Sequence, residues 1–337
     1  MKIFITGSSG CIGHYVVEQL LQNTNHELYL LVRNPAKLKV SIPDAHRVKI
    51  ISGDLHGIED FRDLIQEMDW AILMATAWGD PQETYCINVT QTLRLIELLH
   101  AGNCRHTFYF STESILDRRN QLLPQAGELG TDYIRTKYLC LQQLERSPLA
   151  PNITVFFPTL VFGGDEQKPA SHLSAGLKDI LKWLWLIRFF RVDASFHFLH
   201  AYDIAQVVLG VLEESAKLEA LPQKESFLQG DLDSSFSGKT LGKVILGNPA
   251  LSVNQAIVEI CLYCQRSILF QFPLWIWLAN FFIWLFRVRM ADWDRFCLQY
   301  RHFVHEDSVN PRAFQRQPYA ETIADLLKVS GIPMKGS

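Results

Sequence analysis

A short apolar run leads directly into a glycine-rich turn, and this feature restricts the fold more than any other. Residues 3–5 are followed by TGSSGCIG at positions 6–13, which contains the spacing G-x-x-G-x-x-G. Apolar residues then recur every four positions at Ile12, Val16 and Leu20, as on the buried face of a helix. Glycines between a strand and a helix allow a tight turn and let the backbone approach a pyrophosphate closely. The sequence therefore predicts a dinucleotide-binding turn, with an ordinary glycine-rich loop as the alternative.

Strand-like runs alternate with helical patterns through the first half of the chain. The runs are residues 3–5, 28–32, 48–51, 71–74, 107–110 and 154–157, and one helical pattern covers about residues 83–99. This alternation predicts an α/β fold with a doubly wound, mostly parallel sheet of the Rossmann type. We expect an NAD(P)-binding domain over residues 1–165, with returning segments at about 195–215 and 240–250. Residues 166–337 are expected to form a smaller, mainly helical, C-terminal substrate-binding lobe, with a polar insert at 223–239.

Composition and charge exclude several classes of protein. Hydrophobic residues make up 48% of the 337 positions, which is enough for a substantial core. The formal net charge of −3 shows no basic excess, so no nucleic-acid partner is expected. The seven scattered cysteines favour a reduced, cytoplasmic compartment over a disulfide framework. No metal is expected, because Cys261 and Cys264 form a lone C-x-x-C pair and the histidines show no ligand spacing.

The residue after the second predicted strand bears on the choice of cofactor. Arg33 stands 20 residues after Gly13, where an acidic residue would bind the ribose 2′-hydroxyl of NAD. Arginine can instead accommodate the 2′-phosphate of NADP, and Lys37 could assist it. The sequence therefore favours NADP over NAD, unless Arg33 is only a solvated charge at the strand end. Asp54, after the third strand, could contact the adenine or cap a helix.

A tyrosine and a lysine four residues apart form the candidate catalytic pair. Tyr133 and Lys137 open a predicted helix and share one of its faces. A lysine ammonium beside a phenol favours the phenolate, which can exchange a proton with a carbonyl or hydroxyl oxygen. Thr112 follows the fifth predicted strand and could bind the same substrate oxygen, although Ser111 and Thr112 could also simply cap a turn.

Together these motifs resemble the extended short-chain dehydrogenase/reductase family, also described as NAD-dependent epimerase/dehydratase-like. The resemblance covers residues 1–215 and extends more loosely to the C-terminus. It implies that Lys137 also holds the nicotinamide ribose, that Thr112 and Tyr133 share the substrate oxygen, and that a homodimer forms through a helix pair. The expected cofactor-binding residues are Gly7, Ser8, Ser9, Gly10, Cys11, Ile12, Gly13, Arg33, Lys37, Asp54, Leu55, Ala75, Thr76, Ala77, Asn88, Lys137, Pro158 and Val161.

The sequence also departs from that family pattern. Leu73 and Phe157 stand where the family often has histidine and arginine. Dehydratases of the family carry Asp-Glu after the threonine, whereas this chain has Glu113 and Ser114. A complete dehydratase acid/base set is therefore not expected.

Two aromatic stretches mark the second half. Residues 268–286 form a 19-residue, almost wholly apolar run, and residues 181–190 are similar, with flanking basic residues. Three alternatives remain: a buried or pocket-lining helix, contact with a membrane surface, or a membrane span. The first two favour a lipophilic small-molecule substrate and a cytoplasmic protein, in the second case peripheral at a membrane.

Three functions therefore remain open. The first is an NADP-dependent reductase or dehydrogenase acting on a carbonyl or hydroxyl group of a hydrophobic small molecule. The second is an NAD-dependent sugar-nucleotide epimerase. The third is a non-catalytic, cofactor-binding assembly protein or membrane-associated scaffold.

Overall fold

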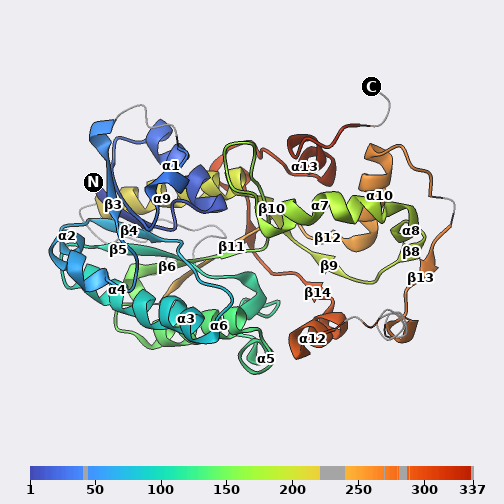
Figure 1. The fold of residues 1–337 in the computed structure, drawn as a ribbon, viewed down its shortest axis with the longest axis horizontal. Helices are drawn as coiled ribbons and strands as arrows, with labels where there is room; N and C mark the ends of the chain where they lie inside the picture. The colour runs from blue at the N-terminus through green and yellow to red at the C-terminus, as the bar shows by residue number, and fades with distance from the viewer. Residues whose placement is uncertain are drawn as a thin grey trace.

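A parallel sheet forms the centre of the molecule (Figure 1). The computed structural model describes residues 1–40, 45–220, 240–268, 270–278, 280, 287 and 289–334. The eight strands follow the order β15-β11-β6-β5-β4-β1-β2-β3, and every neighbouring pair is parallel. This order confirms the doubly wound Rossmann fold, with its switch point between β1 and β4. The strands are β1 (Lys2–Thr6), β2 (Glu27–Val32), β3 (Val48–Ser52), β4 (Trp70–Leu73), β5 (His106–Phe110), β6 (Ile153–Pro158), β11 (Gly242–Leu246) and β15 (Ser308–Val309).

Helices cover both faces of this sheet, which explains why its strands read as continuous apolar runs. Ile3 and Ile5 of β1 pack with α1 (Cys11–Asn23) and α9 (Ala201–Ala220) on one face. Phe4 points to the other face, where it joins a core that includes α4 (Thr92–His100) and α6 (Asp132–Arg146). Figure 1 shows these two helical layers on either side of the strands.

The helical pattern over residues 83–99 proves to be three consecutive segments. α3 (Pro81–Tyr85) leads into a π-helical turn at Cys86–Gln91 and then into α4. The π-turn contains Asn88, and such turns are frequent at functional sites. Two further short helices in the first half of the chain are α2 (Arg62–Gln66) and α5 (Pro124–Glu128).

The second half of the chain builds a lobe at one end of the sheet, on the right of Figure 1. Its helices are α7 (His172–Lys182), α8 (Leu184–Ile187), α10 (Val253–Tyr263), α12 (Asp292–Tyr300) and α13 (Ile323–Val329). Short strands join them: β7 (Leu160–Phe162) pairs with β10 (Phe198–His200), β9 (Ser195–Phe196) with β12 (Leu251–Ser252) and β14 (His302–Phe303), and β8 (Phe190–Arg191) with β13 (Phe272–Pro273).

The chain returns to the main sheet in its second half. β11 lies within the expected returning segment at about 240–250, whereas α9 overlaps the one at about 195–215, continues to Ala220 and packs on one face of the sheet. A further return, at β15, comes late in the expected substrate lobe and forms the sheet edge beside β11. A two-residue strand carries no periodicity that would reveal it. The predicted polar insert at 223–239 lies outside the described residues.

The aromatic stretch 268–286 is only partly described. A single continuous helix, as in the buried-helix and membrane-span alternatives, is not found in the described part, because Phe272 and Pro273 form β13 beside β8. Proline lacks the N–H that a helix interior needs, which favours this break. Among the helices that the structure describes, none has the length and apolar character needed to cross a membrane.

Candidate active site

The glycine turn has a geometry that only glycine satisfies. Gly7 has φ +76°, and a Cβ there would lie 2.6 Å from the Ala75 nitrogen. A Cβ on Gly13 would lie 2.2 Å from the Gly7 carbonyl oxygen. Gly10 precedes α1 and caps it with no side chain, so the first N–H groups of the helix remain available to an anion. This tight, uncapped turn fits a pyrophosphate.

A cavity of about 520 Å³ opens beside this turn, at the carboxyl ends of β1 to β4. It brings together ten of the predicted cofactor residues. These are Gly7, Ser9, Gly10, Arg33, Lys37, Asp54, Leu55, Ala75, Thr76 and Ala77. A larger cavity of about 920 Å³, at the β11–β15 edge, contains none of them.

The other predicted cofactor residues lie outside the lining of this cavity. Ser8 is buried beneath the turn, and its hydroxyl has no partner among the described residues. Cys11, Ile12 and Val161 pack on the core between the sheet and α9. The remaining residues are Gly13, Asn88, Lys137 and Pro158, and all four are buried.

Two exposed basic side chains stand at one end of the cavity. Arg33 follows β2, and Lys37 ends the short 3₁₀ turn Pro35–Lys37, which Asn34 caps. Neither makes an ion pair with any residue that the structure describes. Asp54 accepts hydrogen bonds from the backbone N–H groups of His56 (3.0 Å) and Gly57 (3.3 Å), so it caps the turn after β3 while lining the cavity.

Asn88 is buried behind the wall of this cavity and is not among its lining residues. Its Oδ1 accepts hydrogen bonds from the Thr76 hydroxyl (2.9 Å) and the Ala77 N–H (2.8 Å). Its Nδ2 donates to the Ala77 carbonyl (3.0 Å) and to the Thr136 hydroxyl of α6 (3.1 Å). Because the buried amide is used on both sides, it ties the loop after β4 to the helix that carries Tyr133.

The structure places Tyr133 and Lys137 on one side of α6, but it does not pair the ammonium with the phenol oxygen. Lys137 Nζ donates to the Tyr109 hydroxyl (3.1 Å) and the Phe110 carbonyl (2.8 Å), and lies 6.0 Å from the Tyr133 ring centroid. Burial lowers the pKa of Lys137 to about 8. Burial also raises the pKa of Tyr133, and the Glu113 carboxylate raises it further. The predicted lowering of the tyrosine pKa is therefore not found in this arrangement, in which burial has the largest effect on the pKa of Tyr133.

Trp78 covers Tyr133 and was missed from the sequence. The two rings stack with centroids 3.7 Å apart and planes 11° apart. His172, the first residue of α7, lies 5.5 Å from the indole on the lobe side. Trp78 is 57% exposed and lines the cavity beside the glycine turn, so it stands between that cavity and the lobe. Its position directly after Ala75–Ala77 was the one local signal.

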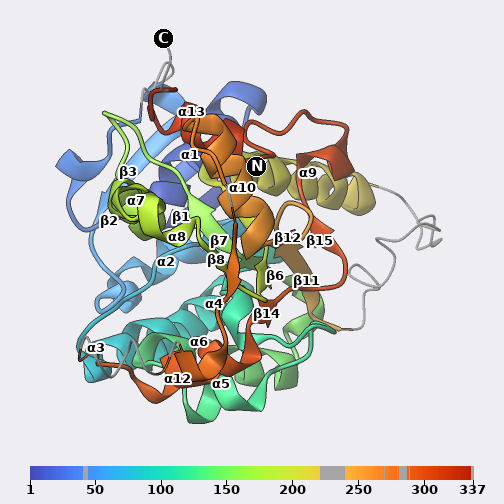
Figure 2. The same cartoon turned by 90° about the vertical axis from the view of Figure 1, so that its right-hand side faces the viewer.

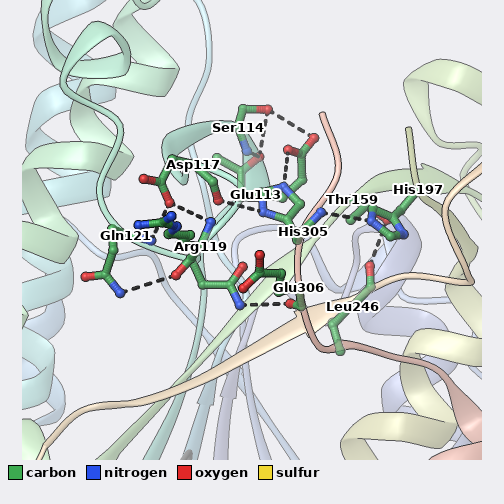
Figure 3. A network of polar contacts seen from close by, with 12 residues as sticks. Glu113, Ser114, Asp117, Arg119, Gln121, Thr159, His197, Leu246, His305 and Glu306 are labelled. Atoms are coloured by element: carbon green, nitrogen blue, oxygen red, sulfur yellow. Dashed lines mark hydrogen bonds and ion pairs between the residues drawn. The ribbon is translucent and has the colours of Figure 1, made fainter. Parts of the chain in front are cut away.

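A buried polar network contains Glu113, Ser114 and His305 (Figure 3), and Thr112 contacts it through the Ser114 hydroxyl. Thr112 caps the 3₁₀ turn Glu113–Ile115, and its hydroxyl lies 3.4 Å from that of Ser114, which contacts Glu113 Oε1 at 3.4 Å. Glu113 Oε2 lies 3.2 Å from His305 Nε2, and both side chains are almost completely buried. Thr112 is thus both a turn cap and the outer end of this network.

His305 holds Glu113 from the far end of the chain. Its Nδ1 faces the Asp117 carbonyl at 3.1 Å, and its backbone N–H donates to His197 Nε2 at 3.0 Å. Both ring nitrogens of His305 thus lie within hydrogen-bond distance of an oxygen, one of a carbonyl and one of a carboxyl group. In the sequence, Glu113 stands out only as a departure from the family pattern, and no local pattern points to His305.

The buried Lys137 ammonium predicts a pH dependence of stability. The unfolded chain, with an ordinary lysine pKa of about 10.4, binds more protons than the folded state between pH 8 and that value. The free energy of unfolding should therefore gain a rising component in this window, while below pH 8 the lysine contribution is constant. Urea unfolding across the window should show this component in the wild type and in Lys217→Met, an exposed control. Lys137→Met should lack it, and an unchanged slope in that variant would contradict the assignment.

Comparisons with known proteins agree with this geometry. The model of the NAD dependent epimerase/dehydratase family matches residues 3–222. A Saccharomyces cerevisiae protein, the uncharacterized YLL056C, is 28% identical over 137 residues, which are 39% of this chain and 44% of the yeast protein. The alignment thus spans less than half of that relative.

Solved structures share the fold at low identity. UDP-glucuronic acid 4-epimerase from Bacillus cereus, in complex with UDP-glucuronic acid and NAD, matches with a TM-score of 0.64 at 15% identity, covering 98% of both chains. dTDP-glucose 4,6-dehydratase from Bacillus anthracis, in complex with NAD, has a TM-score of 0.61 at 14% identity, covering 97% of this chain and 96% of its own. Likeness at this level of identity concerns the fold.

Proposed function

The chain belongs to the NAD-dependent epimerase/dehydratase family, a family of nicotinamide-dependent enzymes, and on that basis we propose that it is an NADP-dependent reductase or dehydrogenase. The observation that carries the proposal is the pair of exposed basic side chains, Arg33 and Lys37, in the cavity beside the glycine turn. Their guanidinium and ammonium groups fit a ribose 2′-phosphate. The predicted cofactor is therefore NADP, with NAD as the alternative.

The chain's own residues would handle the proton of the reaction. When bound, the nicotinamide supplies the hydride donor or acceptor. Tyr133 would exchange a proton with the substrate carbonyl or hydroxyl oxygen, and Thr112 would hold that oxygen. Lys137 would contribute a buried positive charge on the interior side of the site, at the end of β5. The bond from Asn88 to Thr136 keeps α6 in register with the cavity loop.

We infer a lipophilic small-molecule substrate. Trp78 lies over Tyr133, so the side of the phenol next to the lobe is aromatic. The pair Glu113 and Ser114 replaces the Asp-Glu of dehydratases, and Glu113 is engaged by His305. These features support carbonyl reduction of an apolar compound. A homodimer, a division into residues 1–165 and 166–337, a cytoplasmic location and membrane contact through the 268–286 region remain proposals.

Arg33→Ala is expected to weaken NADPH binding roughly 10- to 100-fold, because it removes charge-assisted hydrogen bonds to the 2′-phosphate. NADH binding should change less than about twofold, since NADH lacks that phosphate. Titration of the purified protein by nucleotide fluorescence measures both. Arg295→Ala, which removes an exposed arginine on α12, is the matched control.

The same titration distinguishes the alternatives. If the wild type prefers NADH and Arg33→Ala does not change this preference, Arg33 has no role in cofactor choice. That result would favour an NAD-dependent sugar-nucleotide epimerase. The solved relatives named above, an epimerase and a dehydratase crystallised with NAD, make this the second candidate. Binding of neither nucleotide would favour a non-catalytic scaffold.

A further inference from the structure

One end of the molecule exposes a group of large aromatic side chains. We call it the aromatic face and define it as Trp183, Trp185, Phe270, Phe272, Trp275 and Trp277. Each of these side chains is more than half exposed, from 53% for Phe270 to 64% for Trp277. Large exposed apolar patches mark interaction sites, whereas single exposed apolar residues do not. Figure 2 views the molecule from this end, with α8 and β8 near the centre.

The aromatic face comes from two segments of the chain, residues 183–185 and 270–277, which are connected through packing and strand pairing on their buried side. Leu184 of α8 is buried against α10 together with Ile268, so the neighbouring Trp183 and Trp185 point outward. β8, directly after α8, pairs with β13, and the rings of Phe189 and Phe270 lie 5.3 Å apart. Trp275 and Trp277 stack on each other at 6.0 Å just beyond β13. The lobe thus buries one apolar side of these segments and exposes another.

The two segments that carry the aromatic face have a positive excess. Residues 180–192 and 260–291 contain six basic and no acidic side chains, and four acidic residues border them: Asp179, Asp193, Glu259 and Asp292. Asp179 is paired with Lys182, and Asp193, which lines the same cavity as Trp275 and Trp277, is paired with Arg301. Arg188 is held against the Phe189 ring at 4.8 Å and donates to the Ser267 carbonyl. Arg191 and Arg266 are exposed. A partner for this face must therefore accept aromatic side chains and carry negative charge.

We propose that the aromatic face docks the protein on the surface of a lipid bilayer that contains anionic headgroups. Tryptophan settles at the boundary between headgroups and acyl chains, and nearby lysine or arginine adds electrostatic attraction to anionic lipids. A second copy of the chain is a poorer partner. A two-fold interface would bring the same positive residues against one another.

The docking surface connects to the candidate active site through α7. This helix begins at His172, beside Trp78, and ends at Lys182, next to Trp183. Its 11 residues span about 16 Å. Docking would therefore hold the lobe side of Tyr133 near a source of lipophilic compounds. The docking itself is independent of which reaction the site performs.

Vesicle flotation of the full-length protein tests the proposal. We expect the protein to float with vesicles of equal parts phosphatidylcholine and phosphatidylglycerol, and not with phosphatidylcholine alone. The double variant Trp275→Ala/Trp277→Ala, and separately Arg191→Glu/Arg266→Glu, should each lower the bound fraction about tenfold or more. The controls Tyr319→Ala and Lys217→Glu remove an exposed ring and an exposed charge elsewhere and should bind as wild type.

Other results overturn the proposal. Absence of flotation with anionic vesicles would do so, as would variants that bind like the wild type. A dimer in light scattering that Trp275→Ala/Trp277→Ala dissociates would assign the aromatic face to a second copy. NADPH binding, measured on every variant, should stay unchanged and so keeps a failure of docking separate from a failure of the cofactor assignment.

Discussion

Tyr133→Phe is expected to lower kcat by roughly 10²- to 10⁴-fold, the usual contribution of a positioned acid or base. The substitution removes the one hydroxyl that the proposed reaction uses for proton exchange and keeps the ring that stacks on Trp78. NADPH affinity should therefore stay within about twofold of wild type. The measurement is NADPH oxidation with a lipophilic carbonyl compound, found by screening the wild type.

Tyr138→Phe is the matched control for this prediction. Tyr138 lies on α6 directly after Lys137, is half-buried, and packs its ring beside Gly127. The same loss of a phenol there should leave kcat nearly unchanged. If Tyr133→Phe keeps wild-type activity, Tyr133 is not the proton donor. If the biological role also survives, the scaffold hypothesis replaces catalysis.

The pH dependence of the reaction should follow from burial around Tyr133. A phenol whose pKa is raised by desolvation stays protonated at neutral pH and is therefore suited to donate a proton to a carbonyl oxygen. Lys137, with a pKa of about 8, loses its charge in the range where many enzymes are assayed. Reduction should accordingly be favoured below about pH 8, where the Lys137 ammonium, 6.0 Å from the Tyr133 ring centroid, still stabilises the negative charge that develops as the phenol gives up its proton.

The N-terminal half could be predicted well because its constraints are local. The run of residues 3–5, the glycine spacing and the helical repeat all lie within about twenty residues, and the structure has β1, the turn and α1 there. The steric demand at Gly13 arises from the Gly7 carbonyl six residues earlier. A steric requirement over so short a distance along the chain can be recognised from the sequence alone. The carboxyl ends of the predicted strands then had to meet at one edge, which placed Arg33 and Asp54 in one cavity.

The missed parts of the site depend on distant contacts. Trp78 meets Tyr133, and Glu113 meets His305 across 192 positions, without any periodic pattern that links them. The spacing of Tyr133 and Lys137 correctly indicated a shared helix side. It could not show that Tyr109 and Phe110 would take the ammonium's hydrogen bonds. Sequence thus identified candidate residues but not the competition among their partners, which decides their protonation.

His305→Leu is expected to lower the free energy of unfolding by about 3–5 kcal/mol, the cost of leaving one partner of a buried ion pair alone. Among the residues that the structure describes, the variant would leave the nearly inaccessible Glu113 side chain with the Ser114 hydroxyl as its hydrogen-bond partner, and it would remove the ring nitrogen that contacts the Asp117 carbonyl. Glu113→Leu should cost less, because a neutral His305 can keep its bond to Asp117. Urea unfolding at neutral pH measures both.

The double variant decides whether the pair acts as a unit. Since neither charge then remains buried, Glu113→Leu/His305→Leu should cost about 1–3 kcal/mol less than the sum of the single changes. The chain offers a matched exposed pair in His56 and Glu83, whose ring nitrogen and carboxylate lie 3.0 Å apart with more than 40% of each side chain exposed. His56→Leu should cost less than about 1 kcal/mol, because water already solvates both groups. Equal costs at the two histidines, or additive costs at Glu113 and His305, would show that burial does not make this pair a determinant of stability. Coupling would instead mean that the C-terminal segment between β14 and β15 holds the Glu113 side chain in place, and so joins the lobe to the polar network that begins at Thr112.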